Sequence, residues 1–99
     1  MKDVRINFKG SLITEYYEGD PHARYMPGEF VKWSAYKLEG GGYGIVTDYY
    51  HGVNGLIERE VEFRTFNSLS DLELRGNYPF TFIDWIEEEL GEEEKQETE

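Results

Sequence analysis

A short turn signal between two strand-like runs constrains the fold of this chain more than any other feature. Asn54-Gly55 separates two runs rich in β-branched and aromatic residues within the stretch from Tyr43 to Phe66. Asn-Gly favours the two-residue turns that join antiparallel strands, because both residues tolerate positive φ angles. The sequence therefore predicts a β-hairpin over residues 43–66 at the centre of the fold.

The second half of this hairpin alternates between two kinds of side chain. The apolar positions on one face are Ile57, Val61 and Phe63. The acidic positions on the other face are Glu58, Glu60 and Glu62. Because successive side chains of a strand point to opposite faces, we expect the apolar set to join the core and the three carboxylates to stand in a row in water.

The rest of the N-terminal region predicts further antiparallel strands. A strand or strand pair is expected over residues 4–17, with a bulge or turn at Gly10-Ser11, and another strand over residues 29–38. Residues 18–28 and the glycine-rich residues 39–42 are expected to be loops. Residues 28–33 followed by 43–46 resemble the opening strands of small SH3-like barrels. The expected fold class is α+β, with about five strands in a small twisted antiparallel sheet or an SH3-like, partly closed barrel.

The segment from residue 67 to 76 is ambiguous on sequence alone. Ser68 with Asp71, or Ser70 with Glu73, could cap a single helical turn. A short strand beginning at Leu72 fits the same residues equally well.

An apolar stripe near the C-terminus predicts one helix. Ile83, Ile86 and Leu90 follow the i, i+3, i+7 spacing of a helix face, and Thr81 followed by Asp84 resembles a capping box. The helix is expected over residues 82–90 and to end at Gly91. The predicted organisation is a single domain over residues 1–91, followed by a disordered acidic tail over residues 92–99.

Charge and composition narrow the possible functions. The chain has 10 basic and 21 acidic residues, which gives a net charge of −11. Such a field repels nucleic acid and anionic membranes and attracts a basic partner, although acidity can also serve solubility alone. Because of this charge we expect no direct binding to nucleic acid or to membranes. There is no cysteine and no apolar run of about 18 residues, so we expect a soluble cytoplasmic protein.

No motif for catalysis is present. His22 and His51 are isolated and have no metal-ligand spacing, and no serine lies in a nucleophile elbow. Acid–base catalysis needs a carboxylate in an apolar pocket, whereas the glutamates of the hairpin are predicted to be exposed. We therefore expect a protein that is not an enzyme and that uses neither a metal nor another cofactor.

The glutamate row suggests a different use of charge. Alternate residues of a strand are about 6.8 Å apart, which is on the order of the spacing of successive phosphates along a nucleic-acid strand. The row could therefore imitate a short piece of phosphate backbone, and exposed tyrosines beside it could act as apolar anchors. The candidate partner-binding residues are Asp48, Tyr49, Tyr50, Glu58, Glu60, Glu62, Asp71, Glu73, Asp84, Glu87, Glu88 and Glu89.

In size, acidity and lack of cysteine or catalytic residues, the chain resembles phage-encoded DNA-mimic inhibitors, among them the HU inhibitors of Bacillus phages. This resemblance implies a bacteriophage protein that acts in host takeover by occupying the DNA-binding surface of a host protein. The nucleoid-associated protein HU is the first candidate for that partner. The alternative is a small SH3-like interaction or assembly module that binds through Trp33, Tyr36 and Tyr43. The exposed edge of the hairpin could also pair two copies into a homodimer.

Overall fold

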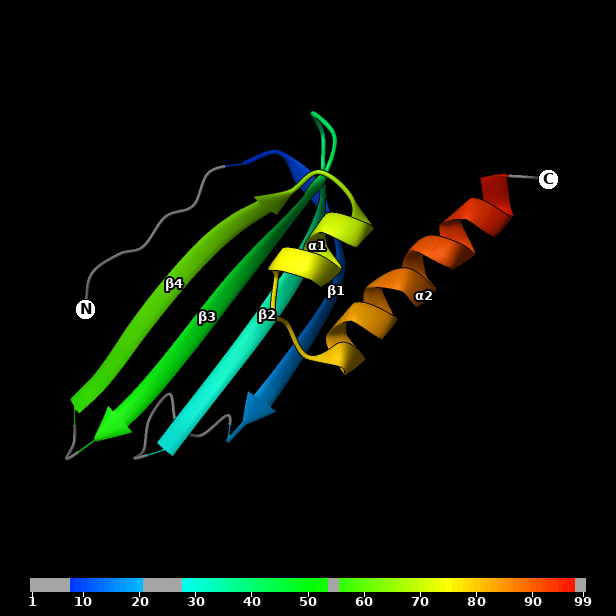
Figure 1. The fold of residues 1–99 in the computed structure, drawn as a ribbon. Coiled ribbons are helices and arrows are strands. Elements are labelled where there is room, and N and C mark those ends of the chain that lie inside the picture. Colours follow the sequence, from blue (N-terminus) through cyan, green and yellow to red (C-terminus); the bar gives the residue numbers. More distant parts are fainter. Residues whose placement is uncertain (1–7, 21–27, 54–55, 98–99) are drawn as a thin grey trace.

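Four β-strands and two α-helices form the fold of the computed structural model, which describes residues 8–20, 28–53 and 56–97 (Figure 1). The elements are β1 (Gly10–Gly19), β2 (Gly28–Leu38), β3 (Tyr43–Val53), β4 (Leu56–Phe66), α1 (Leu69–Arg75) and α2 (Phe80–Glu97). The strands pair antiparallel in the order β1-β2-β3-β4. The predicted α+β class and antiparallel sheet are confirmed. Of the two expected forms, the structure has the open sheet, with β1 and β4 at opposite edges, and the SH3-like barrel is not confirmed.

The central hairpin forms between the predicted residues. Tyr43 pairs with Phe66 at one end, and Val53 pairs with Leu56 at the other, which leaves two residues for the turn. Residues 54–55 themselves lie outside the described part of the chain. The two strands of the hairpin predicted over residues 43–66 are therefore confirmed.

The loop between β2 and β3 depends on glycine. Gly41 and Gly42 have φ angles of 102° and 80°, which side chains other than glycine rarely adopt. The amide of Gly41 donates to the carbonyl of Leu38, and the amide of Leu38 donates to the carbonyl of Gly42, both at 3.1 Å. The glycine-rich residues thus form the predicted hairpin loop.

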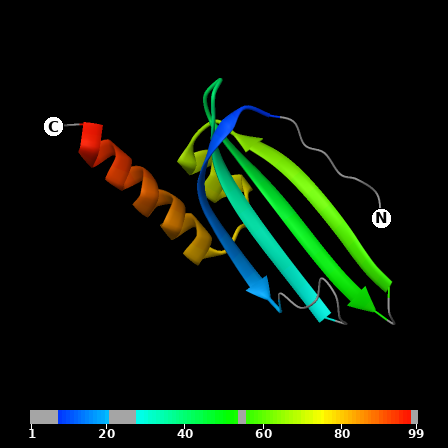
Figure 2. The ribbon, with the colours of Figure 1, turned by 180° about the vertical axis from the view of Figure 1, so that it is seen from behind.

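Both helices lie on one face of the sheet, and the main core lies between them and the strands (Figures 1 and 2). The strands contribute Ala35, Ile45 and Phe66 to this core. The helices contribute Leu72, Phe82, Ile83, Ile86 and Leu90. At its rim the ring of Trp33 lies 6.3 Å from that of Phe82.

The assignment of Ile57, Val61 and Phe63 to this core was wrong. Phe63 pairs with Val46, whereas the core residue Ile45 is the partner of Arg64, so the apolar set of β4 points away from the helices. All three side chains are half-buried on the opposite, open face. Alternation within one strand shows which residues share a face, but it does not show which face the helices cover.

The first strand differs from the prediction at both ends. β1 begins at Gly10, and residues 4–7 of the predicted strand lie outside the described residues. The irregularity expected at Gly10-Ser11 lies instead between Leu12 and Thr14, where the pairing with β2 shifts. β1 then continues through Gly19 into the predicted loop, and residues 21–27 are not described.

The ambiguous segment 67–76 forms helix α1, capped by the first of the two serines. The Ser68 hydroxyl accepts a hydrogen bond from the amide of Asp71 at 3.1 Å, and the Asp71 carboxylate accepts one from the amide of Asn67 at the same distance. The first of these bonds satisfies an amide that the first helical turn leaves without a partner, and the second holds the residue before the cap against the helix. Arg64 of β4 donates to the carbonyls of Arg75 and Gly76 and so joins the end of α1 to the sheet.

Helix α2 contains the predicted apolar stripe but is longer than predicted. It begins at Phe80, so Thr81 lies within its first turn, and it continues past Gly91 to Glu97. Residues 92–97 are therefore helical rather than the start of a disordered tail. A glycine inside a helix costs only about 1 kcal/mol, which the helix-favouring residues around Gly91 offset. Neither α1 nor α2, as described, has the length and apolar character needed to cross a membrane.

Candidate functional site

The glutamate row lies exposed on β4, on the same side of the sheet as the helices. Glu58, Glu60 and Glu62 pair with His51, Tyr49 and Thr47 of β3. All three glutamate side chains are exposed, and the strand geometry separates neighbours in the row by about 6.8 Å. The predicted row therefore exists, although it shares its face with the core rather than lying opposite it.

Aromatic side chains of β3 lie beside this row. The rings of Tyr49 and His51 stack with centroids 6.2 Å apart and an interplanar angle of 8°. Tyr49, Thr47, Glu60 and Glu62 line a hollow of about 430 Å³. The carboxylates thus stand next to an aromatic surface, which suits the side chains of arginine and lysine through charge and cation–π contact.

A fourth carboxylate, which the sequence interpretation missed, joins this surface from β2. The hydroxyl of Tyr49 donates to Glu29 Oε1 at 3.1 Å, and Nδ1 of His51 lies 3.3 Å from the same oxygen. Desolvation raises the pKa of Tyr49, and the hydrogen bond to Glu29 and the charges of Glu29 and Glu60 add to the shift. Glu29 could have been found by aligning β2 and β3 across the glycine loop, because that register places it opposite His51.

The two helices bring further candidate carboxylates together. The hydrogen bond to Glu73 of α1 raises the pKa of Glu87 on α2, and desolvation and the charges of Glu73 and Asp84 raise it further. Glu88 and Glu89 are exposed on the same helix. Three of the predicted helix residues therefore lie close enough for their charges to interact.

Three candidates, Asp48, Tyr50 and Asp71, do not belong to this acidic surface. Asp48 lies on the open face, where Arg59 donates two hydrogen bonds of 2.8 Å to it and stacks over the ring of Tyr50. Asp71 caps α1 and is paired with Arg75, and the hydrogen bond from Arg75 lowers its pKa to about 2. The i, i+4 spacing of Asp71 and Arg75 was a signal in the sequence that this carboxylate would be neutralised.

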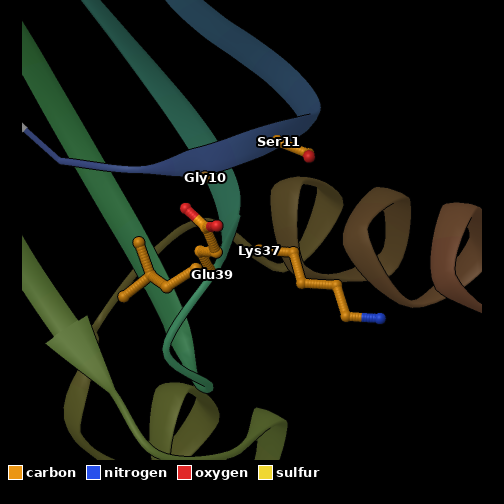
Figure 3. Close-up of a pocket in the computed structure, with 5 residues that line it drawn as sticks. Gly10, Ser11, Lys37 and Glu39 are labelled. Atoms are coloured by element: carbon orange, nitrogen blue, oxygen red, sulfur yellow. The ribbon is translucent and has the colours of Figure 1, made fainter.

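A second hollow of about 430 Å³ lies between the start of β1 and the end of β2 (Figure 3). Gly10, Ser11, Lys37, Leu38 and Glu39 line it. The amine of Lys37 points away from the carboxylate of Glu39, so the two do not form a catalytic pair (Figure 3). Among the described residues, no group of three or more histidine, aspartate or glutamate side chains is arranged to hold a metal ion.

Comparison with protein-family models, with curated proteins and with solved structures found no match to this chain.

Proposed function

We propose that this protein binds the basic DNA-binding surface of another protein through its helix-bearing side and thereby blocks DNA binding. One observation carries the proposal: among the described residues, the carboxylates of the strands are paired with lysine or arginine on the open face, whereas those of the glutamate row on the other face are mostly unpaired. On the open face, Glu15 pairs with Lys32 and Asp48 pairs with Arg59. On the helix-bearing side, the carboxylates of the glutamate row face solvent.

The exposed carboxylates have few cations near them. Within the described part of the chain, Glu58 and Glu60 have no cation at ion-pair distance, and Glu62 has only Arg64 at 4.0 Å. Glu29 is engaged by a tyrosine and a histidine rather than by a lysine or arginine. These carboxylates keep their charge available, and a field of one sign steers an oppositely charged partner and speeds association.

The spacing of the row supports imitation of nucleic acid. Three carboxylates at intervals of about 6.8 Å on a rigid strand match the spacing of successive phosphates more closely than charges on flexible loops would. The ring of Tyr49 in this hollow offers a surface on which the stem of an arginine could lie, with the carboxylates of Glu60 and Glu62 beside it. The partner class is a basic, DNA-binding protein of the host, and the resemblance noted above makes HU the first partner to test.

The alternative, an interaction module that uses exposed aromatics, is supported less well. Trp33 and Tyr43 pack against the core under the helices. Tyr36 lies on the opposite face, where its ring contacts that of Phe8 at 4.7 Å. The three rings therefore do not form one binding surface.

The test compares two variants that each remove three of the eleven net negative charges. One is Glu58→Gln/Glu60→Gln/Glu62→Gln, and the control is Glu92→Gln/Glu93→Gln/Glu94→Gln. Binding to purified HU is measured over a series of salt concentrations, together with competition by duplex DNA. We expect the first variant to lose at least about tenfold in affinity, the control to lose much less, and DNA to displace the wild-type protein.

Two results would count against the proposal. Equal losses in both variants would mean that only net charge matters, not the row. Binding that DNA does not displace, or that is insensitive to salt, would point to a partner surface other than the DNA-binding one. If HU is not bound at all, the same comparison applies to DNA-binding proteins captured from a bacterial lysate by the wild-type protein and not by the first variant.

A further inference from the structure

No helix in the described part of the chain covers the open face of the sheet (Figure 2). Large side chains from all four strands point to this side, including Leu12, Tyr17, Tyr36, Val46, Val61 and Phe63. Leu12 and Tyr17 are 53% and 57% exposed. The ring of Phe8 packs on those of Tyr36 and Phe63, so this part of the face is already covered by another apolar side chain. Isolated apolar residues are common on surfaces, but many of them on one sheet face are typical of an interaction surface.

The charged residues of this face are neutralised within it. Lys32 Nζ lies 3.1 Å from Glu15 Oε2, and Glu15 also accepts a hydrogen bond from Ser34. Arg59 donates a hydrogen bond to each carboxylate oxygen of Asp48. The described side chains of this face therefore add no net charge, in a molecule whose net charge is −11.

We infer that this face packs against the same face of a second copy to form a two-fold symmetric dimer. Two molecules with the same large negative charge repel each other, so they associate most easily through a surface that carries no net charge. A basic partner would find no net negative charge on this face and would bind more favourably to the acidic side. Two-fold symmetry makes the surface its own partner, and antiparallel sheets commonly pack face to face in this way.

The size of the face suits a stable dimer. Four strands of 10 or 11 residues, at about 3.4 Å per residue and about 4.8 Å between strands, cover roughly 700 Å². A standard interface buries about 800 Å² per partner. This dimer differs from pairing through the exposed edge of the hairpin, and it leaves both acidic sides free. It is therefore independent of the proposed function.

The test measures the mass of the full-length protein by sedimentation equilibrium over a range of concentrations. Leu12→Lys and Val61→Lys place a charge on the open face, and Leu56→Lys makes the same kind of change on β4 toward the helix-bearing side, where Leu56 is 73% exposed. Each lysine also reduces the net negative charge, so general repulsion between copies becomes weaker in all three variants. If a variant associates more weakly, the cause is then the position of the lysine on the sheet and not the change in net charge.

We expect a wild-type dimer that becomes tighter as salt screens the repulsion between copies. Leu12→Lys and Val61→Lys should each raise the dimer dissociation constant at least about tenfold, because lysine would be desolvated at the interface, whereas Leu56→Lys should not. Thermal unfolding of the exposed-site variant Leu12→Lys confirms that the monomer is folded. A wild-type monomer at every concentration would overturn the inference and leave the face to another occupant, such as the first seven residues. A dimer that only Leu56→Lys weakens would overturn it in favour of the hairpin edge or the helix-bearing side.

Discussion

Two isoleucines of the central hairpin distinguish the two faces of the sheet. Ile45 on β3 is completely buried in the core beneath the helices, whereas Ile57 on β4 is half-buried on the open face. Replacing either by alanine removes the same three carbons from neighbouring strands. The difference in their effects therefore reports how each face is covered.

The burial of each side chain gives the expected cost. Removing three fully buried carbons loses about 2.4 kcal/mol of transfer free energy, and the cavity raises the loss for Ile45→Ala to about 3–4 kcal/mol. Ile57→Ala leaves no closed cavity and removes carbons that water already reaches in part, so about 1 kcal/mol is expected. A domain of this size has a free energy of unfolding of roughly 5–15 kcal/mol, so the first change is large and the second is tolerable.

Urea unfolding measured at low protein concentration, where copies do not associate, checks both values. With a slope of about 1.5 kcal/mol/M, Ile45→Ala should lower the midpoint by roughly 2 M and Ile57→Ala by less than about 1 M. Equal losses would refute the assignment of a single helix-covered core, because they would require the open face to be covered just as tightly within one molecule.

Other expected outcomes concern the helices and their charges. Ser68→Ala should lower the free energy of unfolding by about 1 kcal/mol in urea titrations, because it leaves the amide of Asp71 without its cap. Gly91→Ala should raise it by about 1 kcal/mol and increase the helical circular dichroism signal, since an added Cβ meets no atom within 4 Å. Glu87 has a raised pKa in the folded protein, so acidification from neutral pH through that pKa should stabilise the wild type in thermal melts, and Glu87→Gln should lose part of this gain. The pKa of Asp71 is lowered to about 2, so its ionised carboxylate stabilises the folded state at pH values above the ordinary pKa of an aspartate. This stabilisation is lost as the pH falls toward 2, and Asp71→Asn should flatten this part of an acid unfolding curve.

The distribution of charge illustrates how far one-dimensional patterns reach. The glutamate row of β4 was predictable because side-chain alternation depends only on the strand that carries it. The pairing of Asp48 with Arg59 joins residues on two strands, and it required the register of β3 and β4 together with the knowledge that both point to the open face. Glu29 entered the candidate site only because the pairing of β2 with β3 places it beside the aromatic residues of the hairpin.

The sequence by itself determined the local features of this protein. The two runs that flank Asn54-Gly55 predicted the strands of the central hairpin, the glycine-rich run predicted the preceding loop, and the spacing of Ile83, Ile86 and Leu90 predicted the second helix. Each of these features depends on residues that are close together in the sequence, so local backbone preferences suffice to specify it.

Only the tertiary structure decided which face of the sheet became the core. Both faces carry large apolar residues, and the alternation of β4 made Ile57, Val61 and Phe63 look like the buried set. The helices instead cover the side of Ala35, Ile45 and Phe66, where apolar residues of neighbouring strands adjoin and the apolar stripe of α2 can pack. This choice depends on the summed surface of several strands and on the path of the chain after β4, so no single stretch of sequence contains it.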